Sequence, residues 1–175
     1  ELGIWMLEDA AHTLPAFTRD GDAWRSVGTT ADVTCFSFYA NKCITTGEGG
    51  MLTTDDGAVA ERVRCMALHG LSTDAWKRHM AGGRWYYEIV APGFKYNMTD
   101  IAAAIGLEQL KRVEWFHERR AVIARRYGAA FSHLPVVVPS AKRPADTHSW
   151  HLYVLQLELE RLAISRNRFI ELLAQ

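Results

Sequence analysis

Short strand-like segments alternate with helix-like segments along this chain, and this alternation constrains its fold more than any single motif. The apolar run Ile4–Leu7 turns acidic at Glu8 and Asp9, which predicts a strand buried in a sheet. Residues 32–40 are rich in β-branched and aromatic side chains and predict a second strand, and residues 51–54 predict a third, shorter one. Strands that alternate with helices predict an α/β fold.

Three helices are predicted from their start and stop signals. Asp55 or Asp56 can cap the first helix, which ends at Gly70. A longer helical pattern covers residues 99–133 and exceeds the usual helix length, so we expect it to kink or to bridge two domains. Ser165 can cap a third helix near the end of the sequence. Residues 71–95 are rich in Gly, Trp and Tyr without a clear period, and we expect a long functional loop there.

Size and charge exclude several classes of protein. The 175 residues suit one domain, or one and a fraction. Twenty basic residues balance twenty acidic ones, so neither nucleic acid nor an anionic membrane is an expected partner. No run of apolar residues is long enough for a membrane span. The sequence has no initiator methionine and begins almost inside a strand, which indicates a fragment.

The cysteines and histidines give no sign of a disulfide framework or a metal site. Cys35, Cys43 and Cys65 are odd in number, lack C-x-x-C spacing and flank apolar residues, as expected for reduced thiols in a cytosolic protein. The seven histidines are scattered and do not show zinc-ligand spacing. We therefore expect no metal.

Two residues could carry chemistry where the predicted strands end. Lys42 follows the second strand in the stretch CFSFYANKCITTGEGG, whose glycines let the backbone pass close to a flat ligand. A fixed lysine can form a covalent link to a carbonyl, although most lysines are simply solvated. Asp9 ends the first strand, where a carboxylate is costly unless it is paired. It could pair with an arginine, cap a helix or hold a cationic ring nitrogen.

Three stretches taken together are more specific than either residue. In this order, EDAAHTLPAF, SFYANKCITTGEGGML and GFKYNMTDIAAAIGLEQL resemble the DegT/StrS family of pyridoxal-phosphate sugar aminotransferases. The resemblance covers roughly residues 1–155. It implies the PLP-dependent transferase fold type I of aspartate aminotransferase. Residues 1–115 would be the later half of the cofactor-binding large domain, residues 116–134 a bridging helix, and residues 135–175 part of the small α/β domain.

The resemblance also implies roles for five residues. Lys42 falls on the lysine that holds the cofactor aldehyde as a Schiff base and then moves a proton. Asp9 falls on the carboxylate that faces the pyridine nitrogen, and His12 lies near the phenolic oxygen. Ser37 falls on a hydroxyl that contacts the cofactor phosphate. Asn97 resembles the asparagine that reaches the phosphate in a neighbouring subunit.

The function implied is amino transfer, with pyridoxal 5'-phosphate as cofactor, from glutamate to a keto-sugar nucleotide. Lys42 separates the chain from a sister branch that has histidine there and performs dehydration. A cytoplasmic homodimer with a shared active site is expected. The alternative is a non-catalytic fragment or association subunit that needs a missing half to bind the cofactor.

Overall fold

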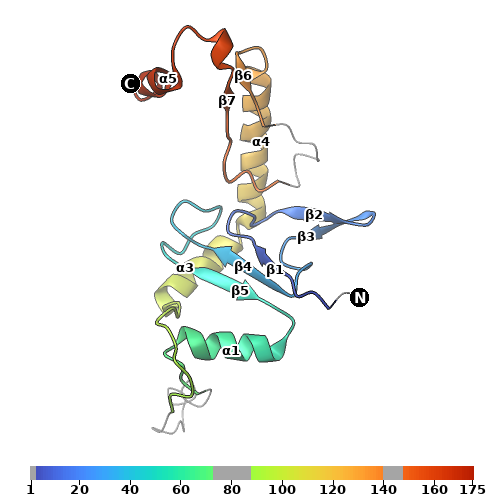
Figure 1. Cartoon of the computed structure of the whole chain (residues 1–175), viewed down its shortest axis with the longest axis vertical. Coiled ribbons are helices and arrows are strands. Elements are labelled where there is room, and N and C mark those ends of the chain that lie inside the picture. Colours follow the sequence, from blue (N-terminus) through green and yellow to red (C-terminus); the bar gives the residue numbers. More distant parts are fainter. Residues whose placement is uncertain (1–2, 73–87, 140–147) are drawn as a thin grey trace.

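The computed structural model describes residues 3–72, 88–139 and 148–175. Figure 1 shows a sheet near the middle of the molecule and a long helix that runs from it towards the C-terminal elements. The described elements, in chain order, are β1 (Leu7–Asp9), β2 (Phe17–Asp20), β3 (Ala23–Ser26), β4 (Val33–Ser37), β5 (Gly50–Thr53), α1 (Gly57–Ala67), α3 (Asp100–Leu110), α4 (Val113–Phe131), β6 (Val136–Val137), β7 (Gln156–Leu157), the 3-10 turn η2 (Leu159–Arg161) and α5 (Arg166–Leu173).

The central sheet is mixed and has the strand order β1–β4–β5. Strand β1 runs parallel to β4, with Asp9 opposite Cys35. Strand β5 runs antiparallel to β4, with Gly50 opposite Ser37. Each strand lies where the sequence predicts one. The register places the carboxyl ends of β1 and β4 side by side, which is the edge where α/β sheets hold ligands.

The expectation that the first strand is buried is wrong for this chain. Ile4 is 76% exposed and Leu7 is 57% exposed. Within the described residues β1 pairs with β4 alone, so its other edge is open and its apolar side chains face solvent. Burial belongs instead to β4, where Val33 and Thr34 are each only 1% exposed.

A hairpin formed by β2 and β3 connects the first two strands of the sheet, and the sequence analysis missed it. Its register pairs Asp20 with Ala23 across a two-residue turn. Gly21 occupies this turn with φ of 59°, a conformation that glycine adopts without strain. All four residues of β3 are exposed, so the hairpin lacks the alternating apolar face that predicts a strand.

The helix boundaries follow local capping chemistry. Asp56 caps α1, because its Oδ1 accepts hydrogen bonds from the backbone of Ala58 at 2.8 Å and of Val59 at 3.1 Å. Gly70 follows with φ of 70°, and its N–H donates to the carbonyl of Cys65 at 2.9 Å. Both signals were predicted. Most of the predicted loop, residues 73–87, lies outside the described residues.

The predicted long helix is broken into two. Thr99 caps α3, and a break at Lys111 and Arg112 separates α3 from the 19-residue α4. The expected kink is therefore confirmed. Figure 1 shows that α4 extends from the sheet to β6, β7 and α5. Ser165 caps α5 by accepting from the N–H of Arg168 at 3.3 Å, also as predicted.

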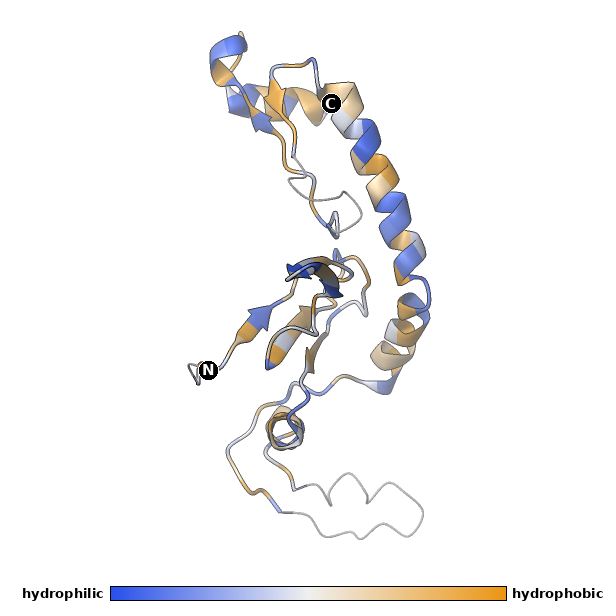
Figure 2. Ribbon diagram, turned by 90° about the vertical axis from the view of Figure 1, so that its right-hand side faces the viewer, coloured by the Kyte–Doolittle hydropathy of each residue, from blue (hydrophilic) through white to orange (hydrophobic). Residues whose placement is uncertain are grey.

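A small apolar core holds α4 to the C-terminal segment. Ala121 and Ala124 of α4 pack with Trp150, and Tyr153 lies against this cluster. Figure 2 shows hydrophilic and hydrophobic stretches alternating along α4. Apolar side chains are exposed elsewhere, including Ile101, which is 78% exposed on α3. None of the helices in the described ranges is long and apolar enough to cross a membrane.

Candidate functional site

The loop after β4 places Lys42 beside the carboxyl end of the sheet. Ser37 is the last residue of β4, and its Oγ accepts a hydrogen bond from the N–H of Tyr39 at 3.4 Å. The N–H of Lys42 donates to the carbonyl of Tyr39 at 3.0 Å, and the chain then returns so that Thr46 donates to Phe38, also at 3.0 Å. Lys42 is half-buried. These bonds hold the lysine in a closed turn.

Helix α3 supports this loop from behind. The side-chain oxygen of Gln109 accepts a hydrogen bond from the N–H of Thr45 at 3.4 Å. Gly106 lies against Thr46, where an added Cβ would lie 2.9 Å from the methyl carbon Cγ2. A glycine is required for this close approach. The position of Lys42 therefore depends on α3.

Asp9 lies at the neighbouring strand end. The N–H of Ala10 donates to the carbonyl of Cys35 at 2.8 Å, which continues the β1–β4 pairing past Asp9. Oδ1 of Asp9 accepts from the N–H of Ala11 at 3.0 Å. This is a local turn, and no helix follows it, so the carboxylate is not a helix cap. Its side chain is exposed.

A segment from the far end of the chain completes this neighbourhood. The hydroxyl of Ser149 donates to the carbonyl of His12 at 2.6 Å, and the two ring centroids of His12 and His151 lie 4.4 Å apart. Sγ of Cys43 donates to the carbonyl of Ser149 at 3.7 Å. Sequence reasoning missed Ser149 and His151, because 137 residues separate Ser149 from His12 and no local pattern connects them.

The electrostatic character of this neighbourhood is cationic. Burial lowers the pKa of His151 from its ordinary value of 6.5, and the charges of His12, Lys42 and Arg120 lower it further. Burial also raises the pKa of the Cys43 thiol, against the opposing effect of Arg120 and Lys42. Basic groups from the turn after β1, the loop after β4 and helix α4 therefore all act on His151. Among the described residues, no group of His, Cys, Asp or Glu is arranged to bind a metal.

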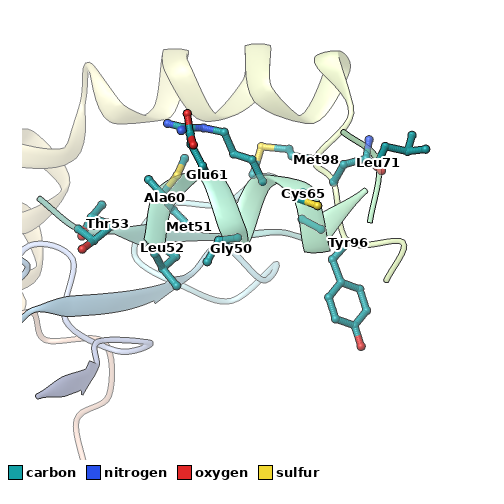
Figure 3. Close-up of a pocket in the computed structure, with 15 residues that line it drawn as sticks. Gly50, Met51, Leu52, Thr53, Ala60, Glu61, Cys65, Leu71, Tyr96 and Met98 are labelled. Atoms are coloured by element: carbon teal, nitrogen blue, oxygen red, sulfur yellow. The ribbon is translucent and has the colours of Figure 1, made fainter. Parts of the chain in front are cut away.

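Asn97 lies just before α3 and has its own contacts. Its Oδ1 accepts a hydrogen bond from Nζ of Lys95 at 2.5 Å. It lines an open pocket of about 820 Å³ beside β5 and α1, shown in Figure 3. The pocket is lined by Gly50, Met51, Leu52, Thr53, Thr54, Ala60, Glu61, Val63, Arg64, Cys65, Ala67, Leu71, Tyr96, Asn97 and Met98. Of the predicted site residues, Asp9, His12, Ser37 and Lys42 lie at or just after the ends of β1 and β4, and Asn97 lies in the pocket beside β5 and α1.

Solved structures share this arrangement of elements. Spr1654 from Streptococcus pneumoniae, solved in a PLP form, is 35% identical, with a TM-score of 0.78 over 96% of this chain and 41% of its own. DesI, solved in the presence of its TDP-sugar product, is 27% identical, with a TM-score of 0.70 over 98% of this chain and 40% of its own. The chain has the type I fold of PLP-dependent transferases, as predicted.

The sequence comparison gives the family. The chain belongs to the DegT/DnrJ/EryC1/StrS aminotransferase family, whose sequence profile matches residues 1–175. SpsC, a spore coat polysaccharide biosynthesis protein of Bacillus subtilis, is 45% identical over 168 residues. The match covers 96% of this chain and 42% of SpsC, so the chain spans less than half the length of this relative.

Proposed function

We propose that this chain forms part of a PLP-dependent aminotransferase that moves an amino group from an amino acid, glutamate, to a keto-sugar nucleotide. One observation carries the proposal. Strands β1 and β4 run parallel with Asp9 opposite Cys35, so the loop that carries Lys42 and the turn that carries His12 both leave the same edge of the sheet. The PLP form of Spr1654 and the sugar product of DesI support the cofactor and the substrate class.

The side chains at the strand ends match the chemical groups of pyridoxal phosphate. Lys42 supplies an amine for the aldehyde, Asp9 a carboxylate for the ring nitrogen, and Ser37 a hydroxyl for the phosphate. His12 would lie beside the phenolic oxygen. When bound, the cofactor supplies a conjugated ring that spreads negative charge from the substrate carbon.

The chain's own residues then divide the work of the reaction. Asp9 would keep a proton on the ring nitrogen, because a carboxylate there would stabilise the positive charge. Lys42 would hold the cofactor through its amine and, once that amine is released, would act as the base that removes a proton from the substrate carbon. The closed turn around Lys42 keeps this amine at one place.

We propose a homodimer with a shared site, in which Asn97 reaches the cofactor phosphate of the neighbouring subunit, and a cytoplasmic location. The position of Asn97 in the stretch GFKYNMTD, which resembles the family pattern, supports the shared site. Residues 1–115, 116–134 and 135–175 are proposed as large-domain half, bridging helix and small-domain part.

The exposed apolar side chains favour a second candidate, in which this chain binds cofactor only after assembly with more polypeptide. Ile4, which lies just before β1, and Ile101, which lies in α3, are each more than three quarters exposed. In that case β1 and α3 would be contact surfaces, and the chain alone would not hold the cofactor.

Covalent trapping tests both candidates. The protein is incubated with pyridoxal phosphate, reduced with borohydride and digested for peptide mass mapping. We expect the label on Lys42 and none after Lys42→Ala, whereas Lys111→Ala, a change at an exposed lysine paired with Glu108, should keep it. A label on another lysine would overturn the assignment. A folded but unlabelled chain that becomes labelled in the longer protein would support the second candidate.

A further inference from the structure

The turn at Trp150 brings the C-terminal segment to the site. Trp150 has φ of 50°, and its N–H donates to Nδ1 of His148 at 2.9 Å. Its ring is buried against Ala121 and Ala124 of α4, while Arg120 donates to its carbonyl at 3.2 Å. The main chain of Trp150 is therefore held by hydrogen bonds at both its N–H and its carbonyl, and its ring is held by packing against α4.

This segment contacts His12 at two points. The hydroxyl of Ser149, which is 4% exposed, binds the backbone carbonyl of His12 at 2.6 Å. The ring of His151 lies against the ring of His12, with centroids 4.4 Å apart and planes tilted by 56°. One contact holds the main chain and the other holds the side chain, so the position of His12 is set from the far end of the sequence.

The ring of His151 makes no hydrogen bond that explains its burial. Its Nδ1 is buried and has no hydrogen-bond partner among the described residues. A buried polar atom without a partner does not stabilise the fold, so the contact of His151 with His12 is one of ring packing rather than of hydrogen bonding through Nδ1. The charged groups that act on His151 are His12, Lys42 and Arg120, and all are basic. Burial and these charges lower the pKa of His151, so its ring stays neutral near neutral pH.

We propose that His151 is a positioning residue of the Lys42 site, which fixes the ring of His12 by packing against it. The significance for catalysis rests on the proposed function, in which His12 lies beside the cofactor. If the ring of His12 is held in one orientation, it presents the same nitrogen to the cofactor in every turnover. A His12 ring that is free to rotate does not.

The direct test observes the two rings without any cofactor. In the intact protein with ¹³C-labelled histidine, we expect a nuclear Overhauser contact between the His12 and His151 rings. His151→Ala should shift the ring signals of His12 and broaden them, and His151→Phe, which keeps a packed ring, should restore a single sharp set. His133→Ala is the matched control, because His133 is exposed near the end of α4. Unchanged His12 signals in His151→Ala would overturn the proposal. If that variant does not fold, the parent protein decides: absence of the nuclear Overhauser contact between the two rings would overturn the proposal.

The second test uses protein loaded with pyridoxal phosphate. His151→Ala should alter the pH dependence of the visible band of the bound cofactor and lower kcat about tenfold, with KM for the amino donor nearly unchanged. His151→Phe should recover most of kcat. An unaltered band and kcat in His151→Ala would reject the role in catalysis. If Lys42 takes up no cofactor in the longer protein either, the proposed function fails, whereas the histidine signals still decide whether His151 positions His12.

Discussion

The hydroxyl of Ser149 donates a 2.6 Å hydrogen bond to the main-chain carbonyl of His12, across 137 residues of sequence. Ser149 is only 4% exposed, so water has little access to the place that its hydroxyl occupies. We predict that Ser149→Ala lowers the free energy of unfolding by about 1 kcal/mol, because the carbonyl of His12 loses its donor.

Urea unfolding followed by circular dichroism measures this effect. Ser132→Ala is the control, since the hydroxyl of Ser132 is exposed and binds only the nearby carbonyl of Ala129. We expect the control to change stability by less than about 0.5 kcal/mol. If the two variants lose the same free energy of unfolding, the long-range bond of Ser149 stabilises the protein no more than the local bond of Ser132.

A second prediction concerns Gly70. Its φ is 70°, and an added Cβ would collide with the carbonyl of Ala91, a backbone group that cannot turn aside. Gly70→Ala should therefore destabilise the protein by more than about 3 kcal/mol or prevent folding. Gly21 has φ of 59° but open space around it, so Gly21→Ala should cost only about 1–2 kcal/mol. Thermal unfolding compares the two, and a smaller loss at Gly70 than at Gly21 would contradict the close packing described here.

A third prediction tests whether two subunits share the site. Lys42→Ala and Asn97→Ala should each be nearly inactive as homodimers. In a mixed dimer, one site combines both changes and the other combines the intact Lys42 with the intact Asn97. Random mixing should therefore restore about one quarter of the parent activity. The measurement is amino transfer by co-expressed variants, and activity no higher than the sum of the separate variants would argue against a shared site.

Asp9→Asn separates charge from shape. The amide oxygen of asparagine can still accept from the N–H of Ala11, so the turn after β1 should survive. The negative charge is lost, and we predict a fall in kcat of at least about a hundredfold with unchanged cofactor binding. Asp22→Asn, in the exposed hairpin turn, is the control. Near-normal kcat in Asp9→Asn would refute the proposed contact with the ring nitrogen.

The pH dependence of stability follows from His148 and His151. Burial lowers the pKa of both from the ordinary 6.5, and His117 lowers that of His148 further. The unfolded chain therefore binds protons at higher pH than the folded chain, and stability falls as pH drops below about 6.5. Protonation of His148 also breaks the bond that its Nδ1 accepts from Trp150.

Urea midpoints at several pH values check this direction. His148→Asn should flatten the decline, because its side chain does not titrate and its oxygen can still accept from Trp150. His133→Asn should leave the decline unchanged. The difference should stay below about 1 kcal/mol, because solvent screens a partly exposed ring. A decline that is equally steep in His148→Asn would locate the titrating groups elsewhere.

Sequence reasoning succeeded where a residue acts on its own neighbours. Asp56, Thr99 and Ser165 cap helices through backbone groups two or three residues away, so the signal and its effect lie in one short window. The strand end at Asp9 was likewise visible, because a change from apolar to acidic residues marks it.

It failed where the partner is distant or the pattern is weak. Nothing near His12 in the sequence indicates Ser149 or His151, since tertiary packing alone joins them. The hairpin escaped notice because its second strand is exposed on both faces, and periodicity needs one buried face. The exposure of Leu7 was missed because apolar composition predicts burial without saying what covers the residue.

The break at Lys111 and Arg112 has a mechanical consequence. The 19 residues of α4 span about 28 Å. A tilt of about 10° at the break would move the far end of the helix by about 5 Å, which is roughly the spacing of two strands. A small rotation of α4 about Arg112 would therefore leave the residues near the break almost in place. The same rotation would move β6, which follows the far end of α4, by about the distance between two strands.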